Sequence, residues 1–398
     1  MPNMGRARTV SLAVLVGAVA IGATVWLSSG PGAHKTPSGS TASPGRSGAT
    51  TAATPTSPTH PVAVAPTFAL YYMWWDRQHW LARLGPDYPT TATRNPLPAT
   101  LDSSGCGTVS NYPGNRLTDV SQDLKYDQSD PKTILHDVES AAASGLSGFA
   151  VNWIGTGQPS QSVNSSHYNQ RLKYMFDAVH QVNANGIPFS LILNYQSSAK
   201  LLPVSQFSND FHYFLTTYGH DPALNHTYSA KPEVIMAGTW KYTDQELEAI
   251  SADARPDMYL IGDEKPASWD AARARSLDGT SYYWSSQDPT NNRSSFASLV
   301  QFAKRVRETP NPDGRAKTWL APFTPGYNAM LLYGTPTCVA RDDGQTMRAL
   351  FQGNVASQPD GWTLISWNEI SEGSYIVPLT RYGNRYLDIL KALLHRTR

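Results

Sequence analysis

GLSGFAVNW (residues 145–153) and GIPFSLILNY (residues 186–195) are the two stretches that decide the fold of this chain. Each contains a short, nearly continuous apolar run, Gly148–Trp153 and Pro188–Tyr195, and a helix-like stretch at about 168–184 separates them. Strands that are covered on both faces have this apolar character, whereas half-exposed strands alternate. Two such strands joined by a helix predict one unit of a parallel sheet.

Working outward, the same pattern repeats on both sides of this unit. Six further apolar runs are Phe68–Met73, Glu233–Gly238, Asp257–Gly262, Ser281–Trp284, Thr318–Pro322 and Trp362–Trp367. Eight strands that alternate with helices predict an α/β protein with a closed (β/α)8 TIM barrel over residues 67–398. An open doubly wound sheet is the alternative, but no glycine-rich nucleotide fingerprint follows any of the runs.

Helix signals lie between the runs. Asp130 followed by Pro131 predicts a helix start, with the end near Ser144, and Thr243–Glu246 has the sequence of a capping box. Further helices are expected at about 168–184, 204–217, 266–275, 294–307, 343–354 and 384–395. The segment from about 75 to 129 is predicted to be a long loop.

The first 66 residues have a different composition. Residues 9–27 form an uncharged apolar run preceded by Arg6 and Arg8. The run is longer than the roughly 7–15 apolar residues of a signal peptide, which favours an uncleaved transmembrane anchor with residues 1–8 in the cytoplasm. Cleavage as a signal peptide, giving a secreted protein, is the alternative. Residues 28–66 are rich in Thr, Pro and Ser and are expected to be a disordered linker. The barrel is therefore expected to be extracytoplasmic.

Composition narrows the classes of partner. The 398 residues carry a formal net charge of +1, and no basic patch indicates nucleic-acid binding. Aromatic residues make up 11% and charged residues only 16%, which suits a carbohydrate partner because sugar faces stack on aromatic rings. The alternative is a large aromatic core. Scattered histidines predict no metal site, no cofactor is implied, and a monomer is expected. The two cysteines, Cys106 and Cys338, could form a disulfide in an oxidising compartment.

Candidate site residues gather where the predicted strands end. In a barrel of this type, catalytic groups lie at the carboxyl ends of the strands. The candidate substrate-binding residues are Tyr72, Trp74, His79, Trp153, Asn194, Asp263, Trp284, Tyr327, Trp367 and Asn368.

Glu369 and Glu372 are the candidate catalytic residues. They follow the last predicted strand and are three positions apart, a spacing that places two side chains on one side of a helical turn. Glycosidic cleavage commonly uses two carboxyl groups, and a separation of about 5–5.5 Å fits retention of configuration. Asp263 and Glu264 form a competing pair, although adjacent residues of a strand point in opposite directions, so only one of them is expected to face the site.

Four segments resemble glycoside hydrolase family 99 and its relatives. WTLISWNEISEGSYIVP (362–378) is similar to the family signature, and YYMWWDRQHW (71–80), AAASGLSGFAVNWIG (141–155) and VARDDGQTMRALF (339–351) resemble three further blocks. The resemblance implies a (β/α)8 barrel with endo-α-mannosidase-like, retaining activity. It also implies that Glu369 assists attack by the sugar 2-hydroxyl, through an epoxide, and that Glu372 is the acid and base.

Two segments depart from the family pattern. Ile370-Ser371 stands where the family has Trp-His, and LILNYQSS (191–198) lacks the glutamate that mannose-active members carry after the third strand. Both differences alter the site, so the expected substrate is an α-linked polysaccharide or glycan rather than mannan in particular. Arg341, in the block before the signature, could hold a catalytic carboxylate ionised, while Asp342 and Asp343 are expected to cap the next helix. The alternatives are a non-catalytic carbohydrate-binding barrel and a glycosidase of another type that uses Asp263 or Glu264.

Overall fold

The computed structural model describes residues 65–85, 106, 117, 126–157, 165–197, 201–286, 296–334 and 337–395. The predicted cytoplasmic segment 1–8, the anchor or signal peptide 9–27 and nearly all of the linker 28–66 lie outside these residues. Among the residues described, no helix is both long enough and apolar enough to span a bilayer.

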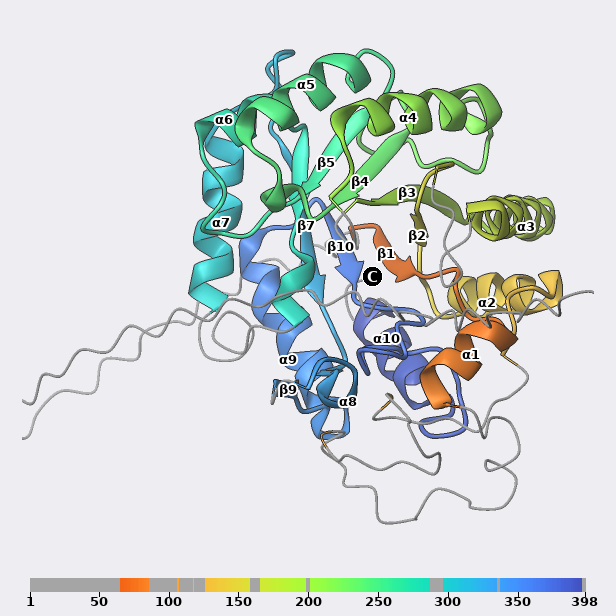
Figure 1. Cartoon of the computed structure of the whole chain (residues 1–398). Coiled ribbons are helices and arrows are strands. Elements are labelled where there is room, and N and C mark those ends of the chain that lie inside the picture. The colour runs from red at the N-terminus through yellow and green to blue at the C-terminus, as the bar shows by residue number, and fades with distance from the viewer. Residues whose placement is uncertain are drawn as a thin grey trace, which may run out of the picture. The chain divides into compact units, whose positions relative to one another are not determined.

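Eight parallel strands close into a barrel, as the sequence predicts (Figure 1). Around the barrel the strand order is β1-β10-β7-β6-β5-β4-β3-β2, so the first strand lies beside the last. Thr67 of β1 pairs with Trp362 of β10, and Phe68 pairs with Gly148 of β2. The strands are β1 (Thr67–Tyr71), β2 (Gly148–Trp153), β3 (Ser190–Gln196), β4 (Glu233–Ala237), β5 (Tyr259–Asp263), β6 (Gly279–Ser281), β7 (Thr318–Phe323) and β10 (Gly361–Leu364).

Side chains alternate between the barrel interior and the helix layer. Phe68, Leu70 and Tyr72 belong to an inner cluster, which also contains Ile192 and Ile261. The intervening residues of the same strands pack in the larger outer cluster that the helices cover. Both faces of each strand are therefore buried, which explains the continuous apolar runs.

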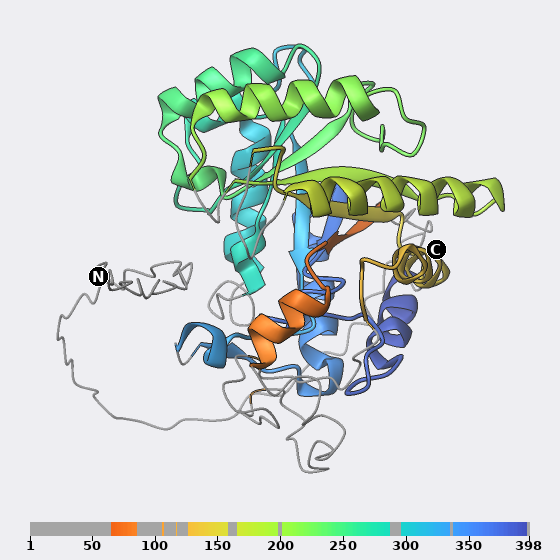
Figure 2. The same ribbon diagram turned by 45° about the vertical axis from the view of Figure 1, so that its right-hand side comes forward.

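Helices lie around the outside of the barrel (Figures 1 and 2). The predicted capping box at Thr243 and Glu246 is present, and Asp130 caps the helix that begins at Pro131. The helices are α1 (Arg77–Leu84), α2 (Pro131–Ala143), α3 (Ser165–Ala184), α4 (Val204–Tyr218), α5 (Asp244–Ala254), α6 (Ala271–Ser276), α7 (Phe296–Glu308), α8 (Met330–Tyr333), α9 (Gln345–Asn354) and α10 (Arg385–His395).

Three local predictions were wrong. The sixth strand covers Gly279–Ser281 rather than 281–284, because the apolar residues from Tyr283 onward turn into a 3₁₀ helix. The expected long loop contains α1, whose N-cap Asp76 accepts a hydrogen bond from the His79 amide. Asp342 and Asp343 do not cap α9: both have positive φ, and the N-cap is Gly344 without a side-chain bond.

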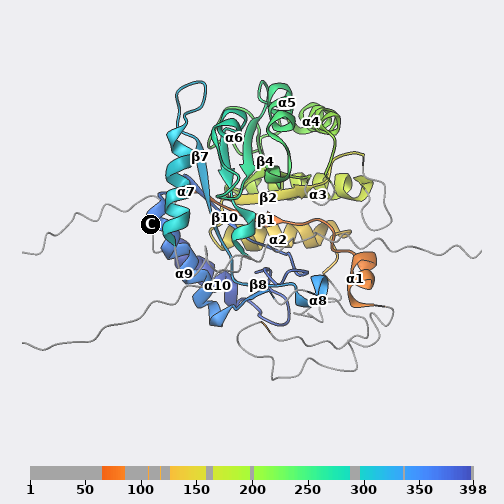
Figure 3. The same cartoon turned by 60° about the vertical axis from the view of Figure 1, so that its left-hand side comes forward.

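A small hairpin that the sequence did not indicate follows β7. Its strands β8 (Tyr327–Asn328) and β9 (Cys338–Val339) are antiparallel, and α8 lies between them. Helices α1 and α8 lie at the same end of the barrel in all three views (Figures 1, 2 and 3). This is the end at which β1 and β7 finish, and therefore the end where the candidate residues lie.

Candidate active site

The segment after β10 carries both candidate glutamates. The Ser366 hydroxyl accepts a hydrogen bond from the Glu369 amide at 2.7 Å, which turns the chain immediately after the strand. Asn368 then fixes this turn to β1, because its side chain accepts from the Tyr72 amide at 2.7 Å and donates to the Tyr72 carbonyl at 2.8 Å. Glu369 and Glu372 are consequently held beside the end of the first strand, almost completely buried at 3% and 7% exposure.

Two tyrosine hydroxyls donate to Glu372. Tyr283, in the 3₁₀ helix after β6, donates to Oε2 at 2.5 Å, and Tyr333, at the end of α8, donates to Oε1 at 3.1 Å. Burial raises the pKa of Glu372, while these two hydrogen bonds act in the opposite direction by stabilising its carboxylate.

Glu369 has a different environment from its partner. Its Oε1 accepts a hydrogen bond from the Ser371 amide at 3.0 Å. Burial, followed by the charge of Glu372, raises the pKa of Glu369 well above its ordinary value. The pair therefore retains a proton at higher pH than two solvated carboxyl groups would.

Asp263 and Glu264 point in opposite directions, as expected for neighbours at the end of a strand. Asp263 accepts hydrogen bonds from the amides of Gly238 at 3.0 Å and Tyr283 at 2.8 Å, and burial raises its pKa to about 6. Glu264 instead accepts from the Ser268 hydroxyl at 2.5 Å and lies 3.6 Å from the Arg273 guanidinium. Only Asp263 is thus connected to the glutamate pair, through the backbone of Tyr283.

Aromatic rings extend from β1 beside the glutamates. Tyr72 stacks on Trp74 with ring centroids 4.5 Å apart, and Trp74 stacks on His79 at 5.7 Å. The charges of Glu369 and Glu372 contribute to raising the pKa of Tyr72, after burial, which places this ring beside the pair. Burial and the nearby arginines hold the pKa of His79 well below its usual range, so it is neutral at physiological pH.

The comparisons with known proteins concern the fold. No protein-family model and no curated protein sequence matches the chain. Solved structures do match: the family 99 endo-α-mannosidase of Bacteroides thetaiotaomicron has a TM-score of 0.60 and 16% identity, over 83% of this chain and 97% of that one. The structure of the same enzyme in complex with bis-tris propane matches with a TM-score of 0.61 and 16% identity, over 84% of this chain and 97% of that one. This chain is therefore similar in its barrel fold to these endo-α-mannosidases. A glycoside hydrolase-like protein also matches, with a TM-score of 0.52 and 13% identity over 68% of this chain and 87% of its own.

Within this barrel, some of the predicted site residues come together and others do not. Tyr72, Trp74, Asp263 and Tyr327 lie around the glutamates; the pKa of Tyr327 is raised by burial and then by the charge of Glu372. Asn194 lies on the inward face of β3, two residues beyond Ile192. Asn368 serves to hold the backbone. The side chain of Trp284 lies outside the described part of the chain.

Trp153 and Trp367 face the helix layer rather than the glutamates. Trp153 donates its Nε1 hydrogen to Asn169 of α3 at 2.7 Å, and Trp367 packs edge-on against Phe149 at 5.3 Å. Trp153 has the outward parity of Val151 in β2, whereas Trp367 lies beyond the end of β10, and both are buried in the outer core cluster. Neither residue is therefore retained as a candidate for substrate binding.

Sequence reasoning missed Tyr283 and Tyr333. Tyr283 precedes Trp284 in a run that was expected to continue as a strand, so its position in a 3₁₀ helix was not visible. Tyr333 lies in a four-residue helix without an N-terminal side-chain cap, and no local pattern identifies it. Across the described residues, no group of three or more His, Cys, Asp or Glu side chains could hold a metal ion.

Proposed function

We propose that this protein is an endo-acting, retaining glycoside hydrolase of α-linked polysaccharide or glycan, with Glu369 and Glu372 as its catalytic residues. The observation that carries the proposal is the pair of buried glutamates at the carboxyl end of β10, with two tyrosine hydroxyls on Glu372. The endo-α-mannosidase activity of the Bacteroides protein with the same fold supports an α-linked substrate cleaved at internal bonds.

The chemistry requires one carboxyl group with its proton and one without. The protonated group donates to the leaving oxygen, while the ionised group promotes attack at the anomeric carbon. Burial and mutual repulsion keep a proton on the pair, which supports this division of roles. The family resemblance assigns the acid to Glu372.

The surrounding residues suit a neutral sugar. Trp74 is only partly buried, and its Nε1 hydrogen has no hydrogen-bond partner among the residues described. A buried donor of this kind is satisfied when a ligand hydroxyl or a water accepts from it. Tyr72, Tyr327 and Asp263 are the further binding residues of this proposal.

The proposed location is extracytoplasmic, on a single N-terminal span at residues 9–27 or, after cleavage, in the medium. The disulfide between Cys106 and Cys338 supports this location, because such bonds persist mainly in oxidising compartments. The protein is proposed to act as a monomer.

The experiment is hydrolysis of a panel of α-mannans, α-glucans and cell-wall glycans by the wild type, Glu369→Gln and Glu372→Gln. We expect internal cleavage by the wild type and a loss of at least about a thousandfold in both variants. An aryl α-glycoside with a good leaving group assigns the roles, because the variant of the acid retains much of its activity on that substrate.

Two other outcomes would contradict this proposal. Binding of a glycan by wild type and variants without turnover would support a non-catalytic carbohydrate-binding barrel. Unchanged hydrolysis by both glutamate variants would place the catalytic groups elsewhere, with Asp263 the next candidate.

A further inference from the structure

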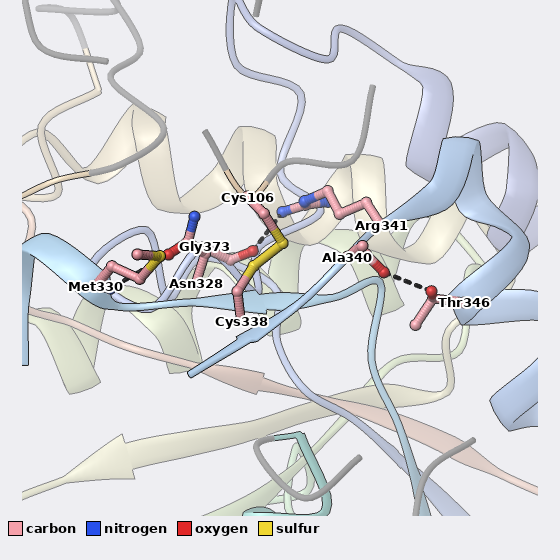
Figure 4. Close-up of a disulfide and its surroundings, with 8 residues drawn as sticks. All are labelled: Cys106, Asn328, Met330, Cys338, Ala340, Arg341, Thr346 and Gly373. Atoms are coloured by element: carbon pink, nitrogen blue, oxygen red, sulfur yellow. Dashed lines mark hydrogen bonds between the residues drawn. A yellow bond between two sulfur atoms is a disulfide. The ribbon is translucent and has the colours of Figure 1, made fainter. Parts of the chain in front are cut away.

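The β8–β9 hairpin connects the disulfide to Glu372. Cys338 lies directly opposite Asn328 in the antiparallel register, and its sulfur is bonded to Cys106, 232 residues earlier in the chain. The Cα atoms of the two cysteines are 5.9 Å apart, an ordinary distance for this bond. Figure 4 shows the disulfide beside Asn328, Arg341 and Gly373.

The hairpin contacts the Glu372 segment at its backbone. The Asn328 amide donates to the Glu372 carbonyl at 2.7 Å. Arg341, two residues after β9 and only 2% exposed, donates from Nη2 to the carbonyls of Gly373 and Tyr375, both at 2.8 Å. The backbone on which Glu372 stands is therefore held by Asn328 of β8 and by Arg341, just beyond β9.

A third contact reaches the carboxyl group itself. Tyr333 closes α8, the short helix between the two hairpin strands, and its hydroxyl donates to Glu372 Oε1. Two strands of two residues each form few mutual hydrogen bonds. The hairpin's own apolar cluster is small: Tyr327, Ala329 and Val339, with Leu332 and Tyr333 packed against them. Hairpins this short are not stable alone in water, so the covalent link to Cys106 restricts movement that the hairpin itself resists weakly.

We propose that Tyr333 is a positioning residue for Glu372 and that the Cys106–Cys338 disulfide keeps the hairpin where Tyr333 can act, so that full activity requires the oxidised protein. This inference rests on the proposed glycosidase function of Glu372. It predicts that loss of the hydroxyl and loss of the disulfide alter the same property of the same carboxyl group.

The first test is Tyr333→Phe in the full chain. Removing a hydrogen bond to a charged group should lower kcat about tenfold with little change in KM, since Glu372 is misplaced more than the substrate. The limb of the pH–rate profile that Glu372 governs should move to higher pH, because its carboxylate loses a donor. Tyr259→Phe is the matched control: that buried hydroxyl, bonded to Thr318 at 2.8 Å, lies at the opposite end of the barrel.

The second test removes the disulfide by reduction and by the Cys106→Ser/Cys338→Ser double variant. We expect the same fall in kcat and the same direction of pH shift, with circular dichroism showing a folded barrel. When the double variant is combined with Tyr333→Phe, the loss of kcat, expressed as a free energy, should be smaller than the sum of the two separate losses, because both changes act through one contact. Wild-type kcat and pH profile in Tyr333→Phe, or full activity after reduction, would overturn the proposal.

A readout without turnover separates this inference from the proposed function. The carboxyl carbon of Glu372, identified by its absence in Glu372→Gln, can be titrated by NMR in protein labelled at glutamate. Its midpoint should rise by about one pH unit in Tyr333→Phe and after reduction. A rise in a protein that cleaves no glycan would refute the function and retain the positioning role; an unchanged midpoint would refute the positioning role.

Discussion

Asp263 and Glu264 show how one step along a strand decides what a carboxyl group can do. Both are buried and both have a raised pKa, about 6 for Asp263 and about 7 for Glu264, with burial as the first cause. Asp263 holds the backbone of the tyrosine that contacts Glu372, whereas Glu264 faces Ser268 and Arg273 under α6. Their chemical similarity in the sequence therefore conceals two different environments.

This difference gives a matched pair of variants. In Asp263→Asn, one of the two amide donors meets an NH2 group instead of an oxygen, which displaces Tyr283; we expect kcat to fall about 10- to 100-fold. Glu264→Gln should retain kcat within about twofold, with any loss confined to thermal stability. The measurement is kcat of both variants on the same glycan. If Glu264→Gln is folded but inactive, the result would favour a glycosidase of another type that uses Glu264 as its acid.

At the scale of elements, the turn after β10 depends on one side chain. Asn368 bonds both backbone groups of Tyr72 and also donates to the Tyr126 hydroxyl at 2.8 Å. Its replacement leaves buried polar groups without partners. The ends of the first and last strands would then keep only the bonds to backbone carbonyls, from the Trp367 amide to Leu70 at 2.8 Å and from Trp75 Nε1 to residue 368 at 2.7 Å.

We expect Asn368→Ala to lower the free energy of unfolding by roughly 3 kcal/mol and to abolish activity. Asn183→Ala is the control, because Asn183 makes a similar double contact to the backbone of Phe189, at 2.8 and 3.0 Å, before β3. It should lose stability while keeping kcat. Urea denaturation and kinetics on both variants check this; equal loss of kcat in the two would mean that general destabilisation, not the turn, explains the result.

The same scale explains what could be predicted from the sequence. Buried parallel strands produce continuous apolar runs, so the barrel and the glutamates after its last strand were visible. Contacts between distant segments produce no local pattern. Tyr333 reaches Glu372 only because a hairpin folds back between them. Trp153 and Trp367 were misplaced because a continuous apolar run does not show which face of the barrel a side chain at its end takes.

For the whole molecule, buried carboxyl groups set an unusual pH dependence of stability. Burial raises the pKa of Asp137 and Asp263 to about 6 and that of Glu233 and Glu264 to about 7. In the unfolded chain these carboxyl groups have their ordinary pKa values near 4, so they lose their protons at lower pH than in the folded protein. Stability should thus be highest below about pH 4.5 for these groups and fall until about pH 7, where the folded protein ionises too.

We expect the free energy of unfolding to be lower at pH 8 than at pH 5, because the part of each shift that lies above pH 5, about 1 pH unit for the aspartates and about 2 for the glutamates, is lost at about 1.4 kcal/mol per unit. Urea denaturation at a series of pH values measures this. Glu233 begins β4 and is remote from the glutamate pair. Glu233→Gln should reduce the fall in the free energy of unfolding with pH by the contribution of this one carboxyl group. A rise in stability from pH 5 to pH 8 would contradict the assignment of these carboxyl groups as buried acids.

Closure of the barrel by β10 also has a consequence for biosynthesis. Both glutamates follow the strand that inserts between β1 and β7, and that strand leaves the ribosome after the other seven. A nascent or truncated chain that lacks it would expose two unpaired strand edges, which favour aggregation. Activity and escape from proteolytic quality control would then be acquired together, when the last strand is released and inserts.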